Sequence, residues 1–151
     1  MLTIYIDADA CPVKDEVYKV ARRYAMKVFV VANSTMRVPA DELFELVVQV
    51  GFGAADDWIA GVIGAGDICI TSDVPLAARC VANGAVALDS KGRLFNADTI
   101  GEAVGVRDLL EELRATGETR GGPAPMTAKD RSRFLSKLDQ AVVAARRPAA
   151  G

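Results

Sequence analysis

The chain contains no histidine. This absence excludes Ser-His-Asp and Cys-His catalysis and histidine-ligated zinc sites, and it removes the commonest general base. Cysteine is scarce too: Cys11, Cys69 and Cys80 form no CxxC pair, so neither a disulfide framework nor a zinc knuckle is expected. If the protein is an enzyme, carboxylates must carry most of its chemistry, together with a hard metal ion.

Long apolar runs are also missing. No stretch approaches the roughly 18 residues that cross a bilayer, and no cationic start precedes an apolar segment of the kind found in secretory signals. The 151 residues are 51% hydrophobic and 25% charged, which is typical of an ordered globular protein. A cytoplasmic protein without membrane association is expected.

Charge is unevenly distributed along the chain. Residues 1–119 hold 11 Lys and Arg against 18 Asp and Glu, whereas residues 120–151 hold 7 against 2. An acidic body with a basic tail can engage an anionic partner, but this balance does not demand nucleic acid. We predict an α/β domain over 1–117, with a Gly/Pro connection and a basic helix over 118–151 that packs on the same domain.

Short β-rich runs alternate with helical patterns. Strands are expected at 2–6, 27–32, 43–50, 67–71 and 85–89, a turn or hairpin at 90–95, and helices at 12–24, 56–65, 74–83, 99–115 and 127–147. In helix 99–115, the apolar residues are expected to face mostly inward: Ile100, Val104, Leu109, Leu110 and Leu113. The alternation indicates a three-layer α/β/α sandwich with a mostly parallel sheet, whose site lies at the carboxyl ends of the strands.

Aspartates occupy this edge of the predicted sheet. Asp7 ends the first strand, Asp73 follows the strand at 67–71, and Asp89 ends the strand at 85–89. Asp9 is two residues from Asp7 and points to the same side if the strand geometry persists. Asp67 precedes its strand and belongs to the opposite edge. Carboxylates gathered without histidine repel one another, and a cluster of them persists if Mg²⁺ or Mn²⁺ neutralises it.

Several other polar residues have two interpretations. Asp56 and Asp57 open a helix, where they either cap its free N–H groups or face the carboxylate cluster. Cys11 lies at a helix start, which lowers a thiol pKa, but without a histidine base we expect no catalytic role. The choice between substrate binding and ordinary turn chemistry applies to four residues that follow strands: Asn33, Ser34, Thr71 and Ser72.

Four ordered motifs span nearly the whole chain: "IDADACPVK", "GAADDWI", "GDICITSDVPLAARC" and "GGPAPMTAKDRSRFLSKLD". Together they resemble the YaiI/YqxD family of uncharacterised bacterial proteins, which is assigned to the PIN-like nuclease superfamily. The resemblance implies a PIN-like α/β/α fold and a carboxylate site that binds Mg²⁺ or Mn²⁺ and cleaves phosphodiesters, often in RNA.

The motifs also assign residues. The resemblance implies that Asp7 and Asp73 are metal ligands and that Asp56 or Asp57 supplies the acid of the intervening helix. Asp9 lies outside the usual PIN pattern and is expected to assist Asp7 and Asp73 in catalysis, while Asp89 is added as a metal ligand because of its strand-end position. The last motif belongs to the YaiI/YqxD pattern, and its cationic residues either bind phosphate over the acidic edge or form a solvated helix face: Arg120, Lys129, Arg131 and Arg133.

Three functions remain open. The first is a metal-dependent nuclease with a nucleic acid, most simply RNA, as its substrate. The second is a haloacid-dehalogenase-type phosphatase, because Asp7 and Asp9 after a strand mimic its D-x-D start, with the first Asp as nucleophile and the second as general acid. The third is a catalytically silent module that binds nucleic acid or protein. The oligomeric state is left open, with a homodimer as one alternative.

Overall fold

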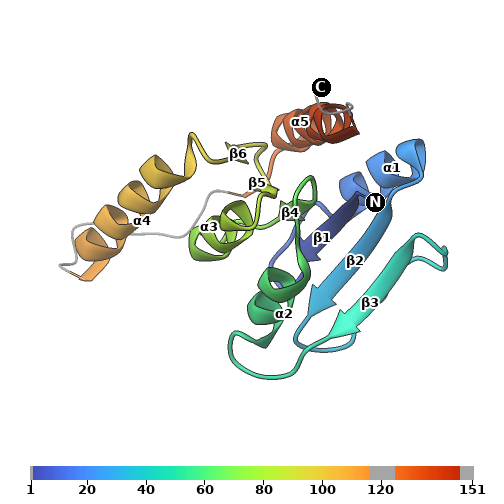
Figure 1. The fold of residues 1–151 in the computed structure, drawn as a ribbon, viewed down its shortest axis with the longest axis horizontal. Coiled ribbons are helices and arrows are strands. Elements are labelled where there is room, and N and C mark those ends of the chain that lie inside the picture. Colours follow the sequence, from blue (N-terminus) through green and yellow to red (C-terminus); the bar gives the residue numbers. More distant parts are fainter. Residues whose placement is uncertain (1, 116–124, 147–151) are drawn as a thin grey trace.

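The computed structural model describes residues 2–115 and 125–146. Strands and helices alternate along the chain as predicted (Figure 1). In order they are β1 (Thr3–Asp7), α1 (Lys14–Tyr24), β2 (Lys27–Ala32), β3 (Phe44–Val48), α2 (Ala54–Val62), β4 (Ile68–Ile70), α3 (Val74–Ala82), β5 (Val86–Leu88), β6 (Leu94–Phe95), α4 (Ile100–Ala115) and α5 (Ala128–Arg146).

Within the described ranges, six strands form one sheet in the order β3-β2-β1-β4-β5-β6. All neighbours are parallel except β6, which returns antiparallel to β5 through a short hairpin. Ile6 of β1 lies opposite Ile70 of β4, so Asp7 and Thr71 follow at the same edge. The strand order reverses between β1 and β4, and open α/β sheets form a crevice at the carboxyl ends of such a pair.

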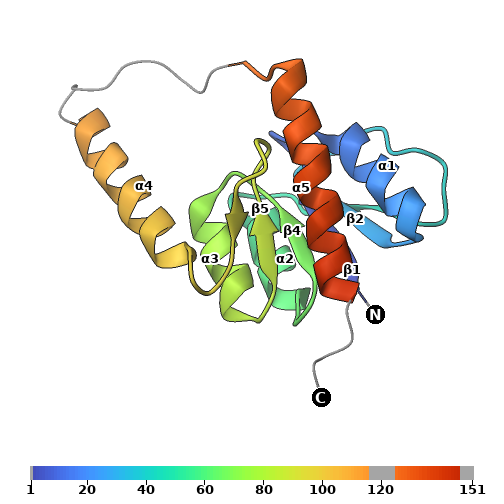
Figure 2. The same ribbon diagram turned by 90° about the horizontal axis from the view of Figure 1, so that it is seen from above.

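Helices cover both faces of the sheet. On one face, α1 and α5 lie side by side (Figures 1 and 2), and Val17, Phe134 and Leu138 are fully buried there against β1 and β2. On the other face, α2 and α3 bury Ile59 and Leu76. The predicted α/β/α fold class is confirmed. No helix in the described part of the chain is both long and apolar enough to cross a membrane.

Helix α4 departs from the prediction. Ala103 is buried near its start, where α4 packs on α3, but Leu109 is 56% exposed and Leu110 is 42% exposed. The expectation that the apolar residues of this helix face mostly inward is therefore wrong for these two leucines. Figure 2 shows the reason: α4 extends away from the sheet, so the sheet does not cover its second half.

Helix α5 is joined to α1 by polar contacts as well as by the core. The Arg131 guanidinium donates to the Pro12 carbonyl at 2.7 Å and pairs with Glu16 at 3.2 Å. At the other end, the Tyr24 hydroxyl donates to Asp139 at 2.6 Å. The predicted connection at 118–124 lies outside the described residues, and the predicted domain boundary stays a prediction.

Replacing Phe134 with alanine is expected to lower the free energy of unfolding by about 3–5 kcal/mol, because the fully buried ring leaves a cavity between α5, α1 and the sheet. Urea denaturation measures the change. Val143→Ala is the matched control: Val143 lies on the same helix but is 40% exposed, and its loss should cost about 0.5 kcal/mol. A small effect of both substitutions would contradict the packing of α5 as part of the core.

Candidate carboxylate site

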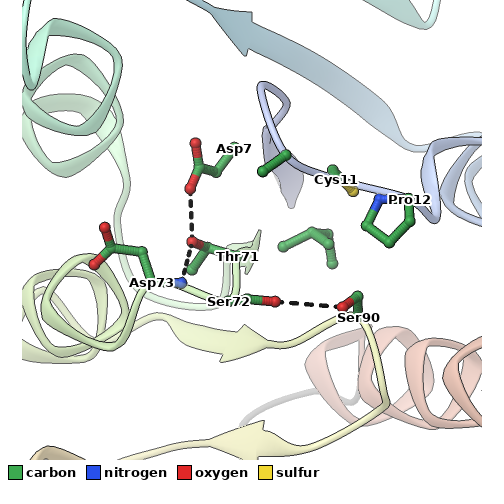
Figure 3. A pocket seen from close by; sticks show the side chains of 9 residues that line it. Asp7, Cys11, Pro12, Thr71, Ser72, Asp73 and Ser90 are labelled. Atoms are coloured by element: carbon green, nitrogen blue, oxygen red, sulfur yellow. Dashed lines mark hydrogen bonds between the residues drawn. The ribbon is translucent and has the colours of Figure 1, made fainter. Parts of the chain in front are cut away.

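A pocket of about 290 Å³ opens where β1 and β4 end. This is the pair of strands at which the sheet order reverses. Figure 3 shows the residues that line it: Asp7, Ala10, Cys11, Pro12, Ile70, Thr71, Ser72, Asp73 and Ser90. Three loops, after β1, β4 and β5, therefore supply one pocket from distant parts of the sequence.

A short chain of hydrogen bonds connects Asp7 to Asp73 (Figure 3). The Thr71 hydroxyl donates to Asp7 Oδ2 at 2.8 Å and accepts the Asp73 N–H at 3.0 Å. Asp73 is the N-cap of α3, where its Oδ1 accepts the Leu76 N–H at 3.0 Å. Because Thr71 is buried, its hydroxyl fixes Asp7 relative to the start of α3. The second oxygen of each carboxylate accepts no hydrogen bond from a described residue.

Asp56, in the first turn of α2, is the third carboxylate at this edge. Burial, followed by the negative charges of Asp7 and Asp73, raises its pKa to about 6. The pKa of Asp7 is also raised, chiefly by burial and further by the charges of Asp73 and Asp9, against the hydrogen bond from Thr71. We call Asp7, Asp56 and Asp73 the carboxylate cluster, since the charges of Asp7 and Asp73 act on Asp56 and the charge of Asp73 acts on Asp7.

Two predicted site aspartates have other partners. Asp9 accepts the backbone N–H of Asn33 at 3.0 Å and so holds the loop after β1 to the end of β2. Asp57 pairs with Arg79 of α3 at 2.8 Å. Of the two helical aspartates, Asp56 therefore lies near Asp7 and Asp73, whereas Asp57 links two helices.

The loop after β5 places its residues differently from expectation. Asp89 Oδ1 accepts the backbone N–H groups of Lys91 and Arg93, both at 2.9 Å, and so shapes the hairpin turn. The next residue, Ser90, lines the pocket instead, with its hydroxyl 3.3 Å from that of Ser72. Sequence reasoning missed Ser90, although its position directly after a strand was the available signal.

None of the remaining candidates for substrate binding that the structure describes lines the pocket. Asn33 and Ser34 are exposed after β2, and Lys129 is exposed on the first turn of α5. Arg131 is held by the contacts with α1 already described, and Arg120 lies outside the described residues. Burial raises the pKa of the Cys11 thiol, so the lowering expected from the helix start is wrong.

The donor chemistry of the cluster suits a hard cation. Mg²⁺ takes oxygen ligands and is commonly held by one or two carboxylates, with waters and substrate phosphates in the remaining positions. Asp7 and Asp73 offer two such carboxylates, fixed relative to one another through Thr71. In residues 2–115 and 125–146, no three His, Cys, Asp or Glu side chains form a ready-made metal site. The residues present therefore fit a cation that is held by the two carboxylates of Asp7 and Asp73, with water or phosphate as its other ligands.

Fold and pocket together define an α/β protein with a carboxylate cluster at the topological switch point of its sheet. The chain belongs to the YaiI/YqxD family, as its resemblance to that family predicted: the family model described as "Uncharacterized BCR, YaiI/YqxD family" matches residues 5–144. This family is bacterial and uncharacterised.

Curated relatives are similar over nearly their full length, and the three described here are called UPF0178 proteins. One from Gluconacetobacter diazotrophicus is 52% identical over 151 residues, which cover 99% of this chain and 98% of the relative. One from Caulobacter sp. strain K31 is 55% identical over 148 residues, covering 97% and 98%. One from Rhodospirillum rubrum is 49% identical over 148 residues, covering 97% and 99%. No solved structure matches the chain.

Replacing Asp56 with asparagine is expected to make thermal stability less dependent on pH. The pKa of Asp56 is about 6 in the folded protein against an ordinary value of 3.8, so this group favours folding fully below about pH 4 and loses that contribution as the pH rises through about 6. At pH 8, Asp56→Asn should therefore have a higher Tm than the wild type. Scanning fluorimetry from pH 4 to 8 measures this, with the exposed Asp98→Asn as control. Identical slopes for wild type and Asp56→Asn would contradict repulsion within the cluster.

Proposed function

We propose that this protein is a divalent-cation-dependent nuclease that hydrolyses phosphodiesters, with RNA as its substrate. The observation that carries the proposal is that Asp7 and Asp73 line one pocket, with Asp56 of the neighbouring helix near enough for their charges to add to the effect of burial, which together raise its pKa to about 6. A cation relieves such repulsion, and a cation held by carboxylates still attracts phosphate. The resemblance to PIN-like nucleases implies the same reaction.

Each residue of the cluster has a role in this proposal. Asp7 and Asp73 hold Mg²⁺ or Mn²⁺, and Thr71 keeps Asp7 in place through its 2.8 Å hydrogen bond. When bound, the cation supplies positive charge that offsets the charge of the phosphate and favours ionisation of an attacking water. Asp56, the carboxylate nearby that is not assigned to the cation, accepts the proton of that water.

Other predicted residues surround this chemistry. The hydroxyls of Ser72 and Ser90 face each other at the pocket and can donate to phosphate oxygens. Asp9 was expected to assist catalysis, and in this proposal it does so through its negative charge, which acts on Asp7. Asp57 and Asp89, expected as metal ligands, are proposed to act indirectly, because one pairs with Arg79 and the other holds the hairpin.

The phosphatase hypothesis receives less support from the geometry. It requires Asp7 as nucleophile and Asp9 as general acid over the same phosphate. Asp7 lines the pocket, but the Asp9 carboxylate is engaged by the Asn33 N–H at the end of β2. The nuclease is therefore the preferred function.

Purified protein is expected to cleave labelled RNA with Mn²⁺ or Mg²⁺ and to lose this activity in EDTA. Asp7→Asn and Asp73→Asn should each lower the rate by about 100-fold or more, because each removes a charged oxygen ligand from the pocket. Gel-based cleavage assays measure the rates. Asp98→Asn removes an exposed carboxylate from the loop before α4 and should leave the rate unchanged.

Two results would overturn the proposal. Turnover of a chromogenic phosphomonoester, with phosphate trapped covalently on Asp7, would identify a phosphatase. If calorimetry detects no binding of Mg²⁺ or Mn²⁺, both enzymatic functions fail and a binding module remains.

A further inference from the structure

Phe52 is the most exposed large apolar side chain in the described part of the chain, with a relative exposure of 108%. Burying an aromatic ring stabilises a fold, and this chain buries Phe44, Phe95 and Phe134. Phe52 forgoes that contribution. Its ring stands in solvent and is free to stack on a flat apolar partner.

The backbone beside Phe52 is built to hold the ring outward. Gly51 has φ +122° and Gly53 has φ +71°, backbone conformations that residues other than glycine rarely adopt. Gly53 is also the N-cap of α2. Phe52 is therefore bracketed by two glycine-dependent turns, directly before a helix that packs against β1 and β2.

This position belongs to the edge of the sheet that carries the carboxylate cluster. Phe52 lies in the loop between the carboxyl end of β3 and the start of α2, and Figure 1 shows that loop at the same end as the arrowheads of β1 and β2. Asp56, in the first turn of α2, lies near enough to Asp7 and Asp73 for their negative charges to act on it. An exposed aromatic ring thus lies directly before the helix that carries Asp56, the carboxylate on which the charges of Asp7 and Asp73 act.

Cationic residues lie on another side of the pocket. Ser90 lines the pocket and is followed by the exposed Lys91. The same hairpin packs on α5, because a Cβ on Gly92 would lie 3.1 Å from Lys137 and 3.5 Å from the side chain of Arg133. Single-stranded nucleic acids are bound by this combination: cations contact the backbone, and aromatic rings stack on bases.

We propose that Phe52 is a stacking platform for one base of a single-stranded nucleic acid whose backbone enters the carboxylate pocket. The inference rests on the proposed nuclease function and specifies its substrate as single-stranded. Stacking suits an acidic body, since it provides affinity that does not depend on positive charge. Phe52 positions the strand and contacts no reacting atom.

A second copy of this chain is the competing occupant, because β3 is an edge strand and Val48 and Val50 near Phe52 are exposed as well. The edge itself opposes pairing: the exposed Glu45 of β3 forms an ion pair with Lys27 of β2 at 3.3 Å. Charged side chains on an edge strand discourage strand addition. The nucleobase is the better-supported partner, and self-association becomes an outcome of the test.

The test compares a short labelled single-stranded RNA with an abasic strand of the same length and charge. Fluorescence anisotropy is measured with Ca²⁺ in place of Mg²⁺, so that binding is observed without turnover. The wild type should bind the base-bearing strand about 5- to 100-fold more tightly than the abasic strand. Phe52→Ala and Phe52→Leu should lose this preference, Phe52→Trp should keep it, and Leu109→Ala, another exposed apolar residue, should behave as wild type.

The preference for bases decides the outcome. The proposal is overturned if Phe52→Ala retains that preference, or if the wild type binds the two strands equally or not at all. Sedimentation velocity of the wild type and of Phe52→Ala tests the competing occupant. The proposal is also overturned if the substitution changes the sedimentation coefficient but not RNA binding, because the ring would then serve self-association. Base-dependent binding without RNA cleavage would retain the stacking platform and reject the nuclease. Metal-dependent cleavage that does not change when the bases are removed would retain the nuclease and reject the stacking platform.

Discussion

The parallel pairing of β1 with β4 is the constraint on which the rest of the structure depends. It places Ile6 opposite Ile70, so Asp7 and Thr71 leave the sheet side by side. The strand order reverses at this pair, and the connections after the two strands therefore run to different sides. The pocket between them follows from topology. Asp7 and Asp73 are brought together by this pairing, and the buried Thr71 hydroxyl then fixes how they lie.

The carboxylate cluster opposes folding while the two cores favour it. Burial and shared negative charge raise the pKa of Asp56, so the site is destabilising once its carboxylates ionise. The cores on the two faces of the sheet bury side chains completely, including Ile6 directly before Asp7 and Ile70 directly before Thr71. A site whose repulsion a cation can relieve is thus built on strands with buried side chains, which keep the carboxylates together when no cation is bound.

The sequence was enough to predict the fold class and the order of strands along the chain, because period-two and helical patterns are local. It was also enough to place Asp7 and Asp73 at one edge, because the carboxyl ends of parallel strands share an edge of the sheet. The choice between Asp56 and Asp57 was not predictable, since neighbouring helical residues point in different directions and only the packing of α2 beside α3 gives Asp57 its partner Arg79. Apolar periodicity likewise says that a helix has an apolar face, but not that the fold covers it, which is why Leu109 was misplaced.

The acidic composition and the proposed substrate are compatible once charge is considered locally. A polyanion is repelled by the body as a whole, yet it needs favourable contacts only along the path from the hairpin at Lys91 to the loop at Phe52. Three different interactions can act along that path: cationic side chains, a cation held by Asp7 and Asp73, and an uncharged aromatic surface. The histidine-free sequence is consistent with this division, because the proposed function gives the proton-accepting role to the carboxylate of Asp56. On this view, the acidic residues determine where the reaction occurs, while the aromatic ring and the cations determine which strand reaches it.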